Sequence, residues 1–168
     1  MRRSDFDRLY EQHASSLFAF VVYRVGSRAV AEDLVADTFE RALRAHRRFD
    51  ARRGSEATWL YAIALNVVRD HGRRAGAESR AMDRLGDDVL RGTGGDQEIA
   101  TLVAQRDELQ RALARLSEDE REALALRYGA GLSIKELAKV TGERETTADG
   151  RVHRALRKLR AELVPPAG

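Results

Sequence analysis

The 168-residue sequence contains no cysteine, only two prolines and few aromatic residues, which make up 6% of the chain. The lack of cysteine excludes disulfide bonds, thiolate zinc sites and cysteine nucleophiles. The small number of aromatic residues favours helices over a β-sandwich. The histidines are far apart in the sequence, so we expect no metal site and no cofactor.

Lysine and long apolar runs are also scarce. Of the 30 basic residues, 27 are arginine, which codon bias in a GC-rich genome explains, although arginine also suits phosphate groups and base edges. The longest apolar stretch runs from Leu17 to Tyr23, far short of the ~20 residues that a membrane helix needs. The sequence turns acidic at Asp5, where a signal peptide would turn apolar. We therefore expect a cytoplasmic protein without membrane insertion.

Charge is unevenly distributed along the chain. Residues 1–74 carry 14 basic and 10 acidic residues, residues 75–97 carry 3 and 5, and residues 98–168 carry 13 and 12. The net charges are therefore +4, −2 and +1. The middle segment also contains five glycines, which is typical of a linker. The sequence thus predicts two domains, at 1–74 and 98–168, joined by a flexible linker at 75–97.

Apolar residues recur at steps of three and four through both domains, and no stretch alternates as a strand would. In the first domain this spacing predicts helices up to Gly26, from 28 to 46, and beyond a polar loop at 49–55. In the second domain it predicts helices at 99–116, after Ser117, at 133–140 and at 145–164. Ser117 with Glu120, and Ser133 with Glu136, have the spacing of capping boxes. The predicted fold class is therefore all-α, with two small helical domains.

The end of the chain has the pattern of a helix-turn-helix. A short capped helix, a turn at Thr141-Gly142-Glu143 and a longer basic helix follow one another. In such a pair the first helix supports the second, whose N-terminal end enters the major groove. The pattern predicts DNA binding; a plain helical hairpin with a solvated basic face is the alternative.

The third predicted helix of the first domain carries a second candidate surface. Thr58, Asn66, Arg69 and Arg73 lie opposite its apolar face, with Trp59 at the edge and Arg52 and Arg53 in the preceding loop. Basic groups with an aromatic ring and an amide suit a single strand or a distorted duplex. The alternative is that Trp59 belongs to the core and the arginines form a solvated rim.

The second predicted helix carries an acidic patch. Glu32, Asp33 and Asp37 lie beside Phe39 and Arg41. Like charges four residues apart destabilise a helix by about 0.2–0.5 kcal/mol, which suggests a basic protein partner. Favourable placement near the positive end of the helix dipole is a sufficient alternative.

No catalytic pattern is present in the sequence. No acid is paired with a histidine, and the phosphate-loop and nucleophile-elbow motifs are absent. We therefore expect no enzymatic activity and no small-molecule substrate.

The order of motifs along the chain resembles a known family. The first domain contains AEDLVADTF at 31–39, FDARRGS at 49–55, WLYAIALN at 59–66 and DHGRR at 70–74. The second contains LSEDERE at 116–122, LRY at 126–128, GLS at 131–133, ELA at 136–138 and RVHRAL at 151–156. This set covers nearly the whole chain and resembles a bacterial RNA polymerase sigma factor of the extracytoplasmic-function (ECF, group IV) class. The first domain resembles region two of such factors, and the second resembles region four.

The resemblance implies a promoter-recognition subunit that binds core RNA polymerase and directs promoter melting and transcription initiation. Implied partners are the clamp coiled coil of the largest subunit, the β-subunit flap, promoter DNA and an anti-sigma factor. The implied polymerase-binding residues are Glu32, Asp33, Asp37, Phe39 and Arg41. The implied minus-ten residues, which would also capture a flipped base, are Arg52, Arg53, Ser55, Thr58, Trp59, Asn66, Arg69, Arg73 and Arg74. The implied minus-thirty-five residues are Ser133, Lys135, Arg144, Thr146, Thr147, Asp149, Arg151 and Arg154.

One segment departs from the family pattern. Glu143, Glu145 and Asp149 crowd the recognition-helix entrance, and Gly150 costs about 1 kcal/mol relative to alanine within a helix. We therefore expect an unusual or weak minus-thirty-five preference. Two other functions remain open: a helix-turn-helix regulator that acts without polymerase, and a helical adaptor with no salt-dependent DNA binding.

Overall fold

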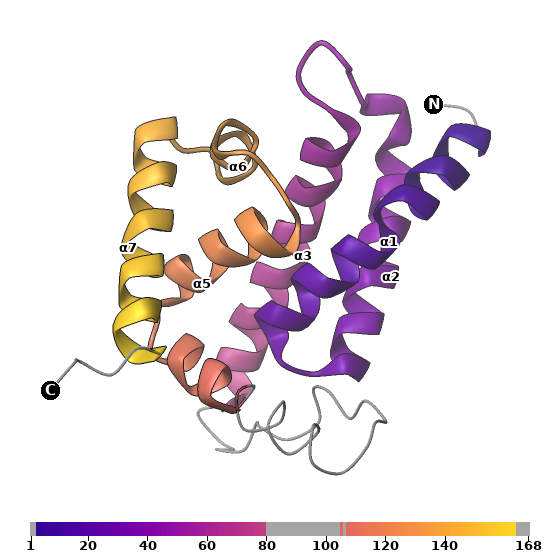
Figure 1. Ribbon diagram of the computed structural model, residues 1–168. Helices are drawn as coiled ribbons and strands as arrows, with labels where there is room; N and C mark the ends of the chain where they lie inside the picture. Colours follow the sequence, from indigo (N-terminus) through magenta and orange to yellow (C-terminus); the bar gives the residue numbers. More distant parts are fainter. Residues whose placement is uncertain (1–2, 80–104, 106, 164–168) are drawn as a thin grey trace, which may run out of the picture.

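A computed structural model of the chain describes residues 3–79, 105 and 107–163, and within these ranges it contains helices and no strands (Figure 1). The N-terminal unit consists of α1 (Arg3–Val25), α2 (Arg28–Ala45), the short 3₁₀ helix η1 (His46–Arg48) and α3 (Glu56–Ser79). The C-terminal unit consists of helical residues 107–114, α5 (Glu118–Leu124), η2 (Ala125–Gly129), α6 (Ile134–Thr141) and α7 (Glu145–Leu163). The predicted all-α fold is confirmed.

Capping residues mark several of the helix boundaries. Gly26, in the left-handed region at φ 72°, separates α1 from α2, and the Ser27 hydroxyl accepts the backbone N–H of Val30 at 3.4 Å. Both predicted capping boxes form, at the starts of α5 and α6. Helix α3 continues to Ser79, past the predicted boundary at 74. The rest of the predicted linker, 80–97, lies outside the described residues.

Helix α5 continues into a π-helical turn, which the spacing of the apolar residues does not predict. Residues Ala125–Gly129 form one π-helical turn, in which the N–H of Ala130 bonds the carbonyl of Ala125 at 2.9 Å. The π-helical turn ends just before Gly131, which lies in the left-handed region at φ 72°. The segment contacts α1, so the distorted turn lies where the two units meet.

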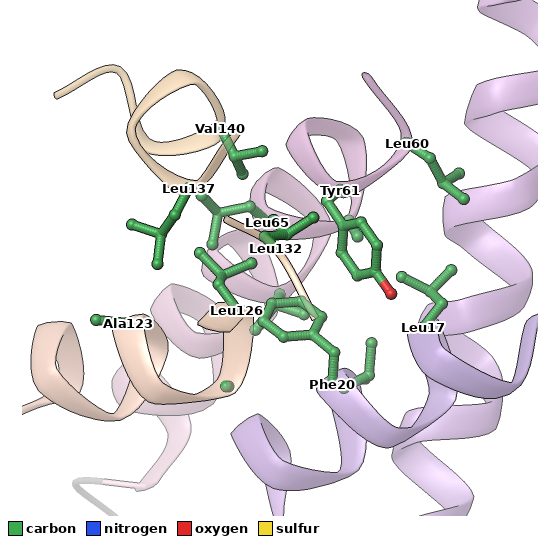
Figure 2. Packing of buried hydrophobic residues seen from close by; sticks show 14 of the residues in the cluster. Leu17, Phe20, Leu60, Tyr61, Leu65, Ala123, Leu126, Leu132, Leu137 and Val140 are labelled. Carbon is green, nitrogen blue, oxygen red and sulfur yellow. The ribbon is translucent and has the colours of Figure 1, made fainter. Parts of the chain in front are cut away.

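The two units share one hydrophobic core. Leu17, Phe20 and Tyr61 from the N-terminal unit belong to the same buried cluster as Leu126, Leu132 and Leu137 from the C-terminal unit. Figure 2 shows Leu126 beside the Phe20 ring and Leu132 beside Leu65. Helix α3 is packed by α1 and α2 and also by α6, so it is buried on more than one side. The predicted domains are therefore docked onto each other.

Candidate polymerase and nucleic-acid interface

The acidic patch of α2 is partly neutralised by arginines of the same helix. Glu32 and Asp33 are exposed, and Arg28 lies 3.6 Å from Glu32. Arg41 donates through Nε and Nη2 to the two carboxylate oxygens of Asp37, at 3.0 and 2.9 Å. These hydrogen bonds are the main cause of the raised pKa of Arg41. Asp33 thus remains an exposed carboxylate beside a fixed ion pair.

Phe39 lies under this patch instead of on it. Its side chain is only 6% exposed and packs edge-on against Phe6, with a second ring contact to Tyr10 at 4.7 Å between centroids. The ring therefore holds α2 against α1 in this structure. Of the predicted polymerase-binding residues, Glu32 and Asp33 are the exposed ones.

The loop before α3 presents basic side chains from a fixed backbone. Asp50 accepts the N–H of Arg52 through its side chain at 3.0 Å and the N–H of Arg53 through its carbonyl at 2.9 Å. Both arginine side chains are exposed. The turn therefore places both residues just before the N-terminal end of α3 (Figure 1).

Ser55 and Thr58 form the N-terminal cap of α3. The Ser55 hydroxyl accepts the N–H of Thr58 at 3.1 Å and lies 2.8 Å from the Thr58 hydroxyl. Thr58 is 8% exposed, whereas the helical pattern predicts it on the polar face. The reason is that its hydroxyl is satisfied inside the cap, so its methyl group can be buried. Trp59 is half-buried and packs on Phe49, with 5.4 Å between ring centroids.

The basic residues of α3 have different environments. Asn66, Arg73 and Arg74 are exposed, and Arg73 is paired with Asp70, whose pKa is lowered mainly by that hydrogen bond. Arg69 instead points toward the C-terminal unit and donates to Glu122 of α5 at 2.7 and 3.3 Å. One predicted minus-ten residue is therefore engaged by the other unit.

The helix-turn-helix forms as predicted, with Gly142 in the left-handed region between α6 and α7. The exposed predicted residues on this motif are Ser133, Lys135, Arg144, Thr146, Thr147, Asp149 and Arg154. Arg151 is largely buried and paired with Glu143, which also accepts the Thr141 hydroxyl at 3.2 Å. Asp149 lies 3.4 Å from His153 Nε2. The entrance acids Glu143 and Asp149 thus lie beside basic groups of α7.

Two residues at the contact between the units were missed by sequence reasoning. Arg24 follows the apolar stretch of α1, and Glu122 is 3% exposed in α5; they lie 3.6 Å apart. Burial is the main cause of the lowered pKa of Arg24. A lone arginine ending an apolar run, in Val-Val-Tyr-Arg-Val, was the one available signal.

In the described part of the chain, no three metal-ligating side chains converge. No helix there is both long and apolar enough to cross a bilayer. The described side chains form charged and aromatic surfaces.

Each of the two units matches a known protein family. The family described as Sigma-70 region 2 matches residues 9–78, and Sigma-70, region 4 matches residues 106–159. The chain is 35% identical over 162 residues to the ECF RNA polymerase sigma factor BldN of Streptomyces coelicolor, covering 95% of this chain and 60% of BldN. It is 38% identical over 158 residues to the ECF RNA polymerase sigma factor SigC of Mycobacterium tuberculosis, covering 89% of this chain and 78% of SigC.

A solved structure has a similar fold. The sigma factor RpoE of Bartonella quintana, in complex with the anti-sigma factor NepR, gives a TM-score of 0.76 at 26% identity. The match covers 97% of this chain and 99% of that one, so the docked arrangement of both units is included. On the two family matches, the curated relatives and this fold, the chain belongs to the ECF RNA polymerase sigma factors, the family of promoter-recognition subunits of RNA polymerase.

Proposed function

We propose that this chain is a group IV ECF sigma factor that binds core RNA polymerase in the cytoplasm and directs it to promoters. The polymerase supplies the catalysis, and this chain supplies recognition. The observation that carries the proposal is the capped α6–α7 pair with exposed Lys135, Arg144 and Arg154. It occurs in the same chain as an exposed acidic helix surface and a basic loop, as a protein that joins DNA to a second macromolecule requires.

The two DNA surfaces suit different forms of DNA. The α6–α7 pair suits a duplex minus-thirty-five element, because the N-terminal end of α7 and its flanking basic groups fit a major groove. The loop with Arg52 and Arg53, followed by Trp59 and Asn66, suits an opened minus-ten strand, because cations and an aromatic platform bind a backbone and unstacked bases. A pocket for one flipped base would offset part of the cost of opening, roughly 1–2 kcal/mol per stacked step.

The acidic surface of α2 is the proposed contact with the clamp coiled coil of the largest polymerase subunit. Glu32 and Asp33 are exposed there, and a surface of one sign steers and aligns a partner of the opposite sign. We place the β-subunit flap against the C-terminal unit. The acidic segment 75–97 would run near the active centre and the RNA exit path; most of it lies outside the described residues.

An anti-sigma factor is the proposed inhibitory partner. Its support is the likeness of the docked arrangement to that of RpoE, which was solved in complex with NepR. An inhibitor that binds this docked arrangement more tightly than an open one would shift the population of chains toward the docked arrangement.

The test is transcription from purified core polymerase of the source bacterium on its own genomic DNA, with and without this chain. Mapping of transcript starts is expected to give new start sites that share upstream elements. A matched reaction with core polymerase alone defines the background. If the chain adds no start site while binding an operator by itself, it is a regulator that acts without polymerase, and the proposal fails.

A further inference from the structure

The turn of the helix-turn-helix contains an acid that is engaged through both of its carboxylate oxygens. Glu143 lies between α6 and α7, and its Oε1 pairs with Nη2 of Arg151 in α7. Its Oε2 accepts the hydroxyl of Thr141, the last residue of α6, at 3.2 Å. One carboxylate therefore joins the end of the first helix to the second turn of the recognition helix.

The backbone of the turn fixes the position of this carboxylate. Gly142 ends α6 in the left-handed conformation at φ 73°, as glycine commonly does after a helix. The N–H of Glu143 bonds the carbonyl of Ala138 in α6 at 2.9 Å. Because α6 holds Glu143 by its backbone as well as by its side chain, the pair with Arg151 fixes α7 relative to α6.

The pair of Glu143 and Arg151 is sheltered from water. The Arg151 side chain is 17% exposed and that of Glu143 is 21% exposed. An ion pair that water reaches contributes little, because solvent screens it. This pair is mostly covered, so removing one partner leaves the other without its counter-charge. Arg154, three residues further along α7, is exposed, so the two arginines of the recognition helix have different environments.

Sequence readout depends on how the recognition helix enters the groove. Hydrogen bonds to base edges need donor–acceptor distances of about 2.7–3.2 Å, so a small rotation of the helix breaks them. Attraction to phosphates acts over a longer range and carries no sequence information directly. A contact that fixes the orientation of α7 therefore contributes more to sequence selectivity than to affinity for DNA in general.

We propose that Glu143 and Arg151 are positioning residues for minus-thirty-five selectivity. Their pair holds α7 in the orientation at which its exposed side chains reach base edges, and Arg151 itself makes no contact with the DNA. This inference rests on the proposed role of the α6–α7 pair in reading a duplex. It also gives a role to Glu143, an acid at the recognition-helix entrance that the helix-turn-helix pattern leaves unexplained.

Selection from a randomised duplex by the holoenzyme tests this inference. The probe is a promoter fragment with a mapped start site, randomised over about 10 base pairs, one helical turn, at the minus-thirty-five position. Core polymerase carrying the wild-type chain or a variant binds the library, and sequencing of bound and unbound DNA gives the preference for the favoured sequence over the library mean. Glu143→Gln should lower this preference about fivefold or more, the cost of one lost base contact. Removing a negative charge should at the same time strengthen binding to DNA in general.

Two matched variants control for the loss of charge. Glu145→Gln removes an exposed acid at the same entrance. Asp119→Asn removes an exposed acid of α5 whose charge, like that of Glu143, acts on Arg69. Both controls should keep the wild-type preference. Wild-type preference in Glu143→Gln, or an equal loss in either control, would overturn the inference.

The arginine of the pair distinguishes positioning from DNA contact. Arg151→Gln should lower the preference as Glu143→Gln does and leave the salt dependence of duplex binding unchanged. A phosphate contact would instead reduce the salt slope by about 1, and that result would refute the role of Arg151. The double variant Glu143→Gln/Arg151→Gln should lose no more preference than the worse single variant, because the two residues act as one unit. Additive losses would mean that they act separately.

The same library separates this inference from the proposed function. The preference is a ratio between sequences bound by the same folded chains, so it does not depend on the fraction of a variant that is folded. If the wild-type holoenzyme selects no sequence in the randomised segment, the proposed role of the α6–α7 pair is wrong, and the inference falls with it. If the wild type selects a sequence and Glu143→Gln selects it equally well, only the positioning role is refuted.

Discussion

Lys158 of α7 donates to Oε1 of Glu120 in α5 at 2.7 Å, while Oε2 of the same carboxylate accepts the backbone N–H of Ser117 at 3.0 Å. One buried side chain thus completes the cap of α5 and anchors the recognition helix. The pKa of Glu120 is lowered from its ordinary value of 4.5, chiefly by the hydrogen bond from Lys158. The ionised form of Glu120 therefore supports the packing of α7 on α5.

This pairing predicts a pH-dependent contribution to stability. The carboxyl has a lower pKa in the folded chain than in the unfolded chain, so its contribution is present above pH 4.5 and is lost as the pH falls through the folded-state value. Glu120→Gln should lower the free energy of unfolding by about 0.5–1 kcal/mol at neutral pH. Urea unfolding should show this difference shrinking in acid. Lys158→Met should reproduce the pattern, and a difference that is constant with pH would contradict it.

The entrance acids of the recognition helix predict a gain in DNA affinity on charge reversal. Asp149 is exposed near the N-terminal end of α7 and lies 3.4 Å from His153 Nε2. Asp149→Lys should strengthen duplex binding several-fold and steepen its salt dependence by about 1–2 units of slope. The matched variant Glu162→Lys makes the same charge change at the other end of α7 and should have a smaller effect. If the two variants have equal duplex affinity and equal salt dependence, Asp149 does not lie at the DNA interface.

The exposed acid of α2 predicts a loss of polymerase affinity without a loss of stability. Asp33 is exposed, so Asp33→Arg should leave thermal unfolding nearly unchanged. Against a basic partner surface it should weaken binding to core polymerase at least about tenfold, equal to about 1.4 kcal/mol. Glu11→Arg, an equally exposed charge reversal on α1, is the control. Parallel losses in the two variants would show a general charge effect, and the assigned surface would be wrong.

Local patterns predict the helices of this chain because each helix carries its own start and stop signals. Ser27, Ser117 and Ser133 satisfy N-terminal amides, and Gly142 adopts the left-handed conformation that ends α6. These are interactions within a few residues, so they are readable from the sequence. The π-helical turn at Ala125–Gly129 is not, because it forms where the chain is packed against another unit.

Contacts between distant segments could not be predicted in the same way. The spacing of α3 predicts one apolar face, yet Tyr61 and Leu65 are also buried. Tyr61 contacts Phe20 and Ser16 of α1. Leu65 lies in the cluster that α3 shares with the C-terminal unit. Thr58 was expected on the polar face, but its hydroxyl is satisfied by Ser55. The pairing of Arg69 with Glu122 joins residues 53 positions apart. Such pairings depend on how the two units dock, and no local pattern encodes that.

Substitutions at Phe39 can distinguish a direct polymerase contact from a structural role. The ring is 6% exposed and packs against Phe6 and Tyr10, so the structural role predicts a loss of stability. Phe39→Ala should lower the free energy of unfolding by about 3–5 kcal/mol, as expected for a large buried side chain with its cavity. Phe39→Leu keeps most of the apolar volume and should cost less than about 1.5 kcal/mol. Denaturant unfolding of both variants measures these changes.

The affinity of the two Phe39 variants for core polymerase then shows which role the ring has. If Phe39 acts by holding α2 on α1, Phe39→Leu should bind core polymerase close to wild type at temperatures where it is folded. The affinity of Phe39→Ala should then fall in proportion to its unfolded fraction, since only folded chains present the acidic surface. A well-folded Phe39→Leu that loses tenfold or more in affinity would instead mean that the ring leaves the core and enters the polymerase interface. Asp33→Arg provides the comparison, because Asp33 is exposed and its charge reversal should lower the affinity for polymerase without changing the free energy of unfolding.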